Sequence, residues 1–314
     1  MRKEEQWVTV KGTEGPGKGK HIVFISGDEE YRSEEALPML AQVMAKHHGF
    51  TCTVLFAVDP KTGFVTPNEQ TNIPGMHHLE TADMIVMLIR FRELPDKDMK
   101  FFIDYTFSGK PILALRTATH AFQYTRNPGS PYAKYTCDNK DKGYEGGFGR
   151  QVLGDTWVAH HGHHAHESTR AVPHASLAGH PILKSVGTIW GPTDVYEVHP
   201  PSDVEILLDG HVLTGMDPKD PEKPNTPTMP VAWIRQPNPK TGTGRIMCST
   251  IGAAVDLKDA SLRRLMVNGI YWCMGMESAI STERRVDPVG AYNPSYYGFS
   301  NISTGKRPQE FFAE

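Results

Sequence analysis

Charged and titratable side chains follow several short apolar segments of this chain, at the point where each segment ends. If those segments are strands of one parallel sheet, their carboxyl ends meet at one edge, where such sheets bind ligands. Guanidinium groups and carboxylates at that edge could hold the oxygen atoms of a polar ligand. The alternative is structural, because acidic residues also favour the start of a helix. The candidate ligand-binding residues are Asp28, Glu29, Tyr31, Arg90, Arg92 and Thr119.

The turn LRTATHA, residues 115–121, lies at the strand-to-helix position that carries the nucleophile in related sheets. It contains neither Cys nor Ser, so we expect no nucleophile there. Arg116 could hold a carboxylate or a developing oxyanion. His120 could transfer protons, because the unperturbed pKa of histidine is about 6.5. A structural histidine that caps the following helix is the alternative for His120.

Five histidines crowd the segment WVAHHGHHAHE, residues 157–167. If this segment begins as a strand, His161 and His163 share one face and could transfer protons. Together with a third ligand they could also hold zinc, whose catalytic sites use three protein ligands. No H-E-x-x-H motif is present, so no cofactor is firmly implied. Zinc at the tract His160–His166 is the candidate metal, and hydrogen bonding to a polar substrate is the alternative.

Three further residues could contact a ligand rich in hydroxyl groups. Trp190 precedes a Gly-Pro turn and could stack on a sugar ring, although packing in the core would also explain it. Asp194 and Tyr196 follow the same turn. They could orient hydroxyl groups, or they could pair with an arginine from a strand end.

The first third of the chain alternates between apolar runs and amphipathic segments. Strands are predicted over 21–26, 51–56, 82–89 and 111–115, and helices over 33–49, 76–80 and 95–109. Strands that are apolar throughout and alternate with helices indicate a parallel sheet covered on both faces. The predicted fold class is therefore α/β, a flavodoxin-like doubly wound and mainly parallel sheet with helices on both faces and long loop insertions.

The rest of the chain is less regular. Residues 123–150 are predicted to form a long surface insertion, and the segment after residue 283 an extended tail. Strand-like runs occupy 193–198, 204–208, 230–234 and 244–250, and a helix is predicted over 261–274.

Composition excludes several classes of protein. The chain has 33 Lys and Arg against 36 Asp and Glu, too little positive charge for a general nucleic-acid binder. The apolar run 84–89 is far shorter than the roughly 20 residues of a membrane span. Cys52, Cys248 and Cys273 lie in apolar segments, which favours buried free thiols. No targeting segment is expected at the start, so the compartment stays open: periplasmic or secreted if a leader has been removed, otherwise cytoplasmic.

Several motifs together resemble the trehalose-utilization (ThuA-like) proteins of the class I glutamine amidotransferase-like superfamily. They are GDEEYRSEEALP from Gly27, LRTATHAF from Leu115, GGFGRQVLGDTWVAHHGHH from Gly146, the His180-Pro181-Ile182 step, GPTDVYEV from Gly191 and PVAWIRQ…GTGRIMCSTIGA from Pro230. The resemblance implies a family domain over 21–276, between an N-terminal extension (1–20) and a C-terminal tail (277–314). It also implies a flavodoxin-like core and a role in bacterial disaccharide catabolism, acting on keto-sugars.

Two departures from the family limit what the resemblance implies. Glutamine amidotransferases need a Cys at the turn 115–121, which has none, so glutaminase activity is not expected. Many relatives carry Gly-His where this chain has Gly252-Ala253, so no role of that histidine is carried over.

Two functions remain open on the sequence alone. The first is an enzyme, a hydrolase, lyase or isomerase that acts on a sugar or keto-sugar by acid/base chemistry. The second is a carbohydrate-binding or scaffolding protein without catalysis. Both imply a small-molecule carbohydrate partner, with neither nucleic acid nor membrane, and a homo-oligomer stays open. The clustering of titratable groups favours the enzyme.

Overall fold

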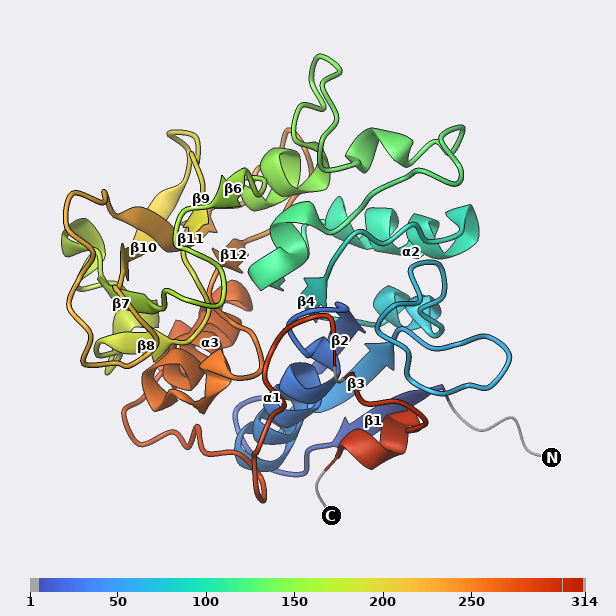
Figure 1. Cartoon of the computed structure of the whole chain (residues 1–314). Helices are drawn as coiled ribbons and strands as arrows, with labels where there is room; N and C mark the ends of the chain where they lie inside the picture. Colours follow the sequence, from blue (N-terminus) through green and yellow to red (C-terminus); the bar gives the residue numbers. More distant parts are fainter. Residues whose placement is uncertain (1–5, 301, 313–314) are drawn as a thin grey trace.

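A single mixed sheet of ten strands runs through the computed structural model, which describes residues 6–300 and 302–312 (Figure 1). Its strand order is β1-β3-β2-β4-β5-β12-β11-β10-β7-β8. Five neighbouring strands in the middle of this order are mutually parallel. They are β3 (Thr51–Phe56), β2 (His21–Gly27), β4 (Met84–Ile89), β5 (Ile112–Leu115) and β12 (Ile246–Ser249).

Antiparallel strands extend the sheet on both sides of the parallel region. β1 (Trp7–Lys11) pairs with β3 within the segment assigned to an N-terminal extension. On the other side lie β11 (Met229–Arg235), β10 (Glu205–Val212), β7 (Thr169–Pro173) and β8 (Ile189–Gly191). The predicted α/β class is confirmed, but the sheet is mixed rather than mainly parallel. The physical reason is that β10, β11 and β12 follow one another without the helical crossover that a parallel pair needs.

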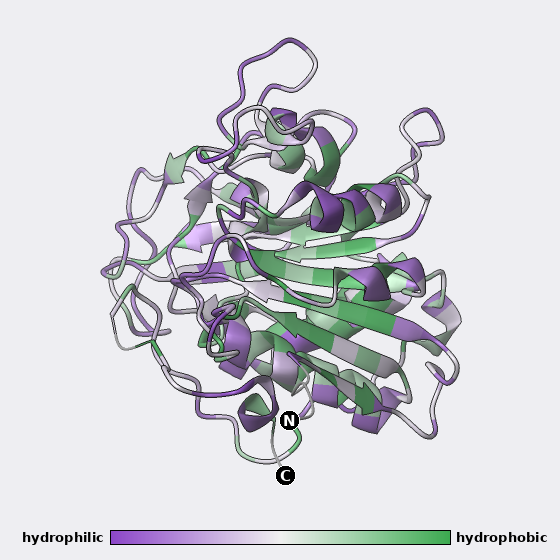
Figure 2. Ribbon diagram, turned by 90° about the vertical axis from the view of Figure 1, so that its right-hand side faces the viewer, coloured by the Kyte–Doolittle hydropathy of each residue, from purple (hydrophilic) through white to green (hydrophobic). Residues whose placement is uncertain are grey.

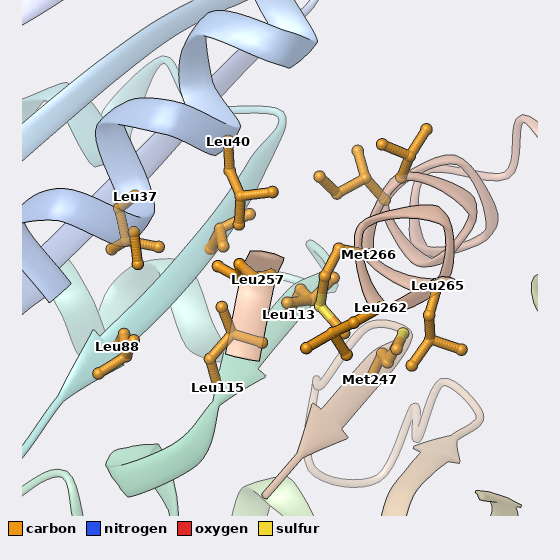
Figure 3. Close-up of a cluster of buried hydrophobic side chains, with 14 of the residues drawn as sticks. Leu37, Leu40, Leu88, Leu113, Leu115, Met247, Leu257, Leu262, Leu265 and Met266 are labelled. Atoms are coloured by element: carbon orange, nitrogen blue, oxygen red, sulfur yellow. The ribbon is translucent and has the colours of Figure 1, made fainter. Parts of the chain in front are cut away.

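Helices cover both faces of the parallel region. α1 (Ser33–His48) and α3 (Ala260–Cys273) pack on one face, where Leu37, Leu40, Leu262 and Leu265 point toward the strands (Figure 3). α2 (Asp96–Thr106) packs on the opposite face. Side chains alternate between the faces, because Ile22 and Phe24 of β2 join the first core and Val23 and Ile25 join the second. Figure 2 shows these apolar strands between the more hydrophilic outer segments.

The predicted helices and parallel strands are confirmed to within a few residues. Their boundaries follow from local chemistry: α1 ends at Gly49, whose φ of +83° suits glycine, and the Asp259 side chain caps α3 by accepting from the Leu262 N–H. Cys52, Cys248 and Cys273 are buried and free, as predicted. No helix in the described part of the chain is long and apolar enough to cross a membrane.

Short elements complete the framework, and three of them lie at the candidate site. These are η2 (Arg116–His120), which follows β5, and the two-stranded pair of β6 (Ala159–His160) with β9 (Tyr196–Glu197). The remaining short helices are η1 (Met76–Glu80), η3 (Ala133–Tyr135), η4 (Gly149–Leu153), η5 (Ala175–Leu177), η6 (Pro181–Leu183), η7 (Asp256–Lys258), η8 (Glu277–Ala279) and η9 (Pro308–Phe311).

Candidate active site

The loop after β2 is fixed by the buried carboxylate of Asp28. Its Oδ1 accepts hydrogen bonds from the backbone N–H groups of Glu30 (2.7 Å) and Tyr31 (2.6 Å), and its Oδ2 accepts from the hydroxyl of Thr117. Burial raises the pKa of Asp28. Asp28 is fully buried, so it orients the loop and does not reach a ligand, in contrast to the predicted direct contact.

Glu29 joins this loop to the strand end at β4. Its carboxylate accepts from Arg90 Nη1 at 2.5 Å and from Arg92 Nη2. Arg92 is fully buried and also donates to the backbone carbonyls of Pro67 and Glu69, so the predicted ligand contact of Arg92 is replaced by a structural role. Arg90 keeps a partly exposed guanidinium at the edge of the site.

Arg116 occupies the first position of the turn after β5, with a φ of +43°, in the left-handed region that non-glycine residues seldom adopt. Its guanidinium lies 3.7 Å from the ring centre of Tyr196 and 4.5 Å from that of Tyr31. It donates to the Thr250 carbonyl and to Asp194, whose Oδ1 is 3.0 Å away. Arg116 is fully buried, so it holds Asp194 in place and does not touch a ligand as the sequence suggested.

Asp194 is the centre of the polar cluster. Its Oδ2 lies 2.6 Å from Nδ1 of His160, and its Oδ1 lies 2.9 Å from Nδ1 of His164. Burial alone would raise the pKa of Asp194, but the Arg116 guanidinium and the two imidazoles together lower it below its ordinary value. A carboxylate therefore anchors two imidazole rings at once.

The two histidines that Asp194 anchors differ in the surroundings of their second ring nitrogen, Nε2. Nε2 of His164 lies 3.1 Å from Oε1 of Glu30, and the hydrogen bonds to Asp194 and Glu30 raise the pKa of His164 to about 9. Nε2 of His160 has no hydrogen bond to a described residue, and its side chain is 37% exposed. His160 therefore presents a ring nitrogen to solvent, while Asp194 fixes the orientation of the ring.

His120 lies beside this cluster, separated from it by aromatic rings. Trp157 and Tyr196 each pack on both His120 and His160, with ring centres 5.5 to 6.1 Å apart. Nδ1 of His120 lies 3.2 Å from the Thr119 hydroxyl. Burial lowers the pKa of His120 well below its ordinary value. Its Nε2 has no hydrogen-bond partner among the described residues, and the residue as a whole is 4% exposed.

The histidine tract is used differently from the prediction. Nε2 of His161 lies 2.8 Å from the Pro227 carbonyl, and the His163 ring stacks on His166 at 4.4 Å. The predicted pairing of His161 with His163 is therefore not what the structure shows. The reason is that β6 ends at His160, so strand alternation does not continue through the tract.

Other predicted residues fall inside or outside the cluster. Tyr31 and Tyr196 lie within it but are buried against Arg116, and Thr119 is buried beside His120. Trp190 lies on β8, where its Nε1 donates to the Ser168 hydroxyl, and no described contact joins it to the cluster.

Glu30 is a candidate that the sequence did not single out. Within the tract expected to hold zinc, the structure brings together His160 and His164 rather than His161 and His163, and their spacing of four residues was the available signal. Ligand atoms of His160, His164 and Asp194 all lie within 4.8 Å of one another, so these three residues could hold a metal ion.

A groove of about 680 Å³ is lined by the rings of Phe91 and Trp157, and these two rings separate it from His120, on which both pack. Its aromatic and amide side chains could contact a sugar through ring stacking and hydrogen bonds. The lining includes Phe91, Trp157, Gln70, Gln123 and Asn139.

Comparison with known proteins identifies solved structures that have a similar fold. No protein-family model matches the chain, and no curated protein matches it either. Among solved structures, a protein described as ThuA-like from Bacteroides uniformis superposes with a TM-score of 0.52 at 14% identity, covering 83% of this chain and 94% of that one. One from Parabacteroides merdae, also described as ThuA-like, has a TM-score of 0.50 at 13% identity, covering 95% and 100%. The chain therefore has the fold of the ThuA-like proteins, in agreement with the resemblance of its motifs.

Proposed function

We propose that this protein is a carbohydrate-processing enzyme that acts on a sugar or keto-sugar derivative by acid/base chemistry. The observation that carries the proposal is the buried carboxylate of Asp194, which anchors His160 and His164 at one edge of the sheet. His120 lies next to this cluster and packs against the rings of Trp157 and Tyr196. A buried carboxylate that is hydrogen-bonded to partly exposed imidazoles is typical of catalytic sites, and folding alone does not require it.

The roles follow from the exposure and protonation of each group. Burial lowers the pKa of His120, so its ring is neutral at physiological pH, and its Nε2, which has no partner among the described residues, can accept a proton from a bound substrate. Nε2 of His160 can hydrogen-bond a hydroxyl or carbonyl oxygen, since Asp194 fixes the ring through Nδ1. Hydrolysis, elimination and isomerisation of a glycoside all need such a proton transfer next to a held oxygen.

The substrate class rests on the ThuA-like fold and on the groove beside the cluster. The resemblance implies disaccharide catabolism and keto-sugars, and the groove offers aromatic rings with amide groups around them. A proton on the carbon next to a ketone is acidic enough for a neutral imidazole to remove when the oxygen is stabilised.

The arrangement of the central strands supports a finer description of the fold. The order β3-β2-β4-β5-β12, with helices on both faces, is the order expected of a flavodoxin-like doubly wound core. We also propose a domain over 21–276 as the unit that carries the site.

A substrate screen tests the proposal. Purified protein is incubated with glycosides and 3-keto-glycosides, and product formation is followed for the parent, for His120→Gln and for the control His174→Gln. The control lies in another Asp–His pair, with Asp209, away from the cluster. Turnover that His120→Gln loses and His174→Gln keeps supports the enzyme. Sugar binding without turnover by the parent supports the non-catalytic carbohydrate-binding alternative.

A further inference from the structure

One imidazole in the polar cluster is shared by two carboxylates. Nδ1 of His164 lies 2.9 Å from Asp194, and its Nε2 lies 3.1 Å from Glu30. A neutral imidazole has one N–H group, so it can donate to only one of the two. The other contact would bring a nitrogen lone pair against a carboxylate oxygen. A positive charge therefore belongs in this cluster, carried either by an imidazolium or by a bound cation.

The donor atoms around that charge are those of a transition-metal site. His160 and His164 supply two imidazoles and Asp194 supplies a carboxylate, with all ligand atoms within 4.8 Å of one another. Two imidazoles with one carboxylate form the ligand set of many catalytic zinc sites and of non-haem iron sites. Magnesium and calcium prefer sites built from oxygen atoms alone.

The surroundings of the three residues add two independent observations. Arg116 fixes the Asp194 carboxylate and is itself fixed by the Thr250 carbonyl, as the outer residues of metal sites fix their ligands. His160 and His164 are 37% and 30% exposed, so an ion can enter from solvent and keep open positions for a substrate oxygen.

The other Asp–His and Glu–His pairs in the described part of the chain lack this convergence. His174 lies on Asp209, His199 on Glu197 and His211 on Glu222, each as a single imidazole on a single carboxylate. Within the described residues, the cluster at Asp194 is the one group of three or more such side chains close enough to share an ion.

We propose that His160, His164 and Asp194 bind one divalent transition-metal ion, with Zn²⁺ as the reference ion and Glu30 as a neighbouring carboxylate. The inference deepens the proposed function and rests on it for the role of the ion, which would polarise a substrate oxygen. Ion binding itself is measured without any substrate.

The test uses the full chain after removal of metals with a chelator. Calorimetric titration with Zn²⁺ alone is expected to give one ion per chain and a higher Tm in the presence of the ion. His160→Gln and His164→Gln are each expected to weaken binding by at least about 100-fold. The matched control is the double variant His163→Gln, His166→Gln, which removes two stacked histidines from the same tract.

The result that overturns the inference is absence of stoichiometric Zn²⁺ binding, or equal loss of binding in the control variant. Circular dichroism verifies that each variant is folded, and because the rings of His160 and His164 are partly exposed, retention of the fold is the expected result. Zinc binding without turnover of any sugar would keep this inference and defeat the proposed function. Turnover of a sugar by a chain that binds no metal would keep the proposed function and defeat this inference.

Discussion

Oδ2 of Asp194 lies 2.6 Å from Nδ1 of His160, although 34 residues separate the two along the chain. The carboxylate belongs to the loop before β9 and the imidazole to the end of β6, and these two strands pair with each other. The short pair β6–β9 therefore brings the acid and the histidine together. Arg116, from the turn after β5, completes the arrangement by holding the other carboxylate oxygen.

Arg116 is expected to contribute to stability as well as to the site. Arg116→Met leaves the Asp194 carboxylate buried without its guanidinium partner, and loss of one member of a buried pair costs about 3–5 kcal/mol. Arg116→Lys keeps the charge but loses the forked donors, so we expect a smaller loss. Urea unfolding of the parent and both variants measures these differences. An unchanged free energy of unfolding in Arg116→Met would show that the buried pair does not stabilise the fold.

The buried carboxyl group of Glu34 predicts a pH-dependent stability. No other described residue donates a hydrogen bond to its oxygens, and burial raises its pKa from the ordinary 4.5 to about 8. The folded state therefore holds the proton more tightly than the unfolded state. The stabilisation that this provides is complete below pH 4.5 and is lost as the pH rises to about 8, at up to about 1.4 kcal/mol per pH unit.

The matched experiment is thermal unfolding of Glu34→Gln between pH 5 and pH 8. The neutral amide removes the titration, so the Tm of this variant is expected to exceed that of the parent increasingly as the pH rises. Glu80→Gln, at an exposed position, serves as the control. If the Tm of the parent and the Tm of Glu34→Gln changed in parallel over this pH range, the raised pKa of Glu34 would be contradicted.

Much of the framework could be predicted from the sequence because it depends on local periodicity. The strand before Arg116 is apolar at every position, and the strand before Asp28 is apolar from Ile22 to Ile25; that pattern indicates a buried parallel strand. The gathering of loop residues at one sheet edge then follows from topology. The burial of Arg116 could not be predicted in this way, because its partners Asp194 and Thr250 lie 78 and 134 residues further along.

The expected shared face of His161 and His163 differs from the structure for a similar reason. The sequence could not reveal that β6 has only two residues, so strand alternation was extended too far. The chain instead turns after His160, and this turn brings His164 back to the same carboxylate. The spacing of four residues relates His160 to His164, but nothing in the local sequence identifies the distant carboxylate of Asp194 that holds both rings.

His120 is expected to act in turnover rather than in binding. His120→Gln keeps a hydrogen-bonding group but cannot take up a proton, so turnover should fall by about 10²–10⁴-fold with little change in KM. Activity that depends on the neutral ring should persist in mildly acidic solution, because the pKa of His120 lies well below its ordinary value. Steady-state kinetics on a substrate found in the screen measure both effects. An unchanged kcat in His120→Gln would remove this residue from the chemistry.

The most direct test of the account is the value of kcat/KM for Asp194→Asn, on a glycoside or 3-keto-glycoside that the parent converts. The substitution keeps the size of the side chain but removes the charge that anchors His160 and His164. We predict a fall of about 10²–10⁴-fold in kcat/KM for the folded variant, because the two imidazoles lose their fixed orientation. A folded Asp194→Asn variant with the kcat/KM of the parent would contradict the claim that this cluster is the active site.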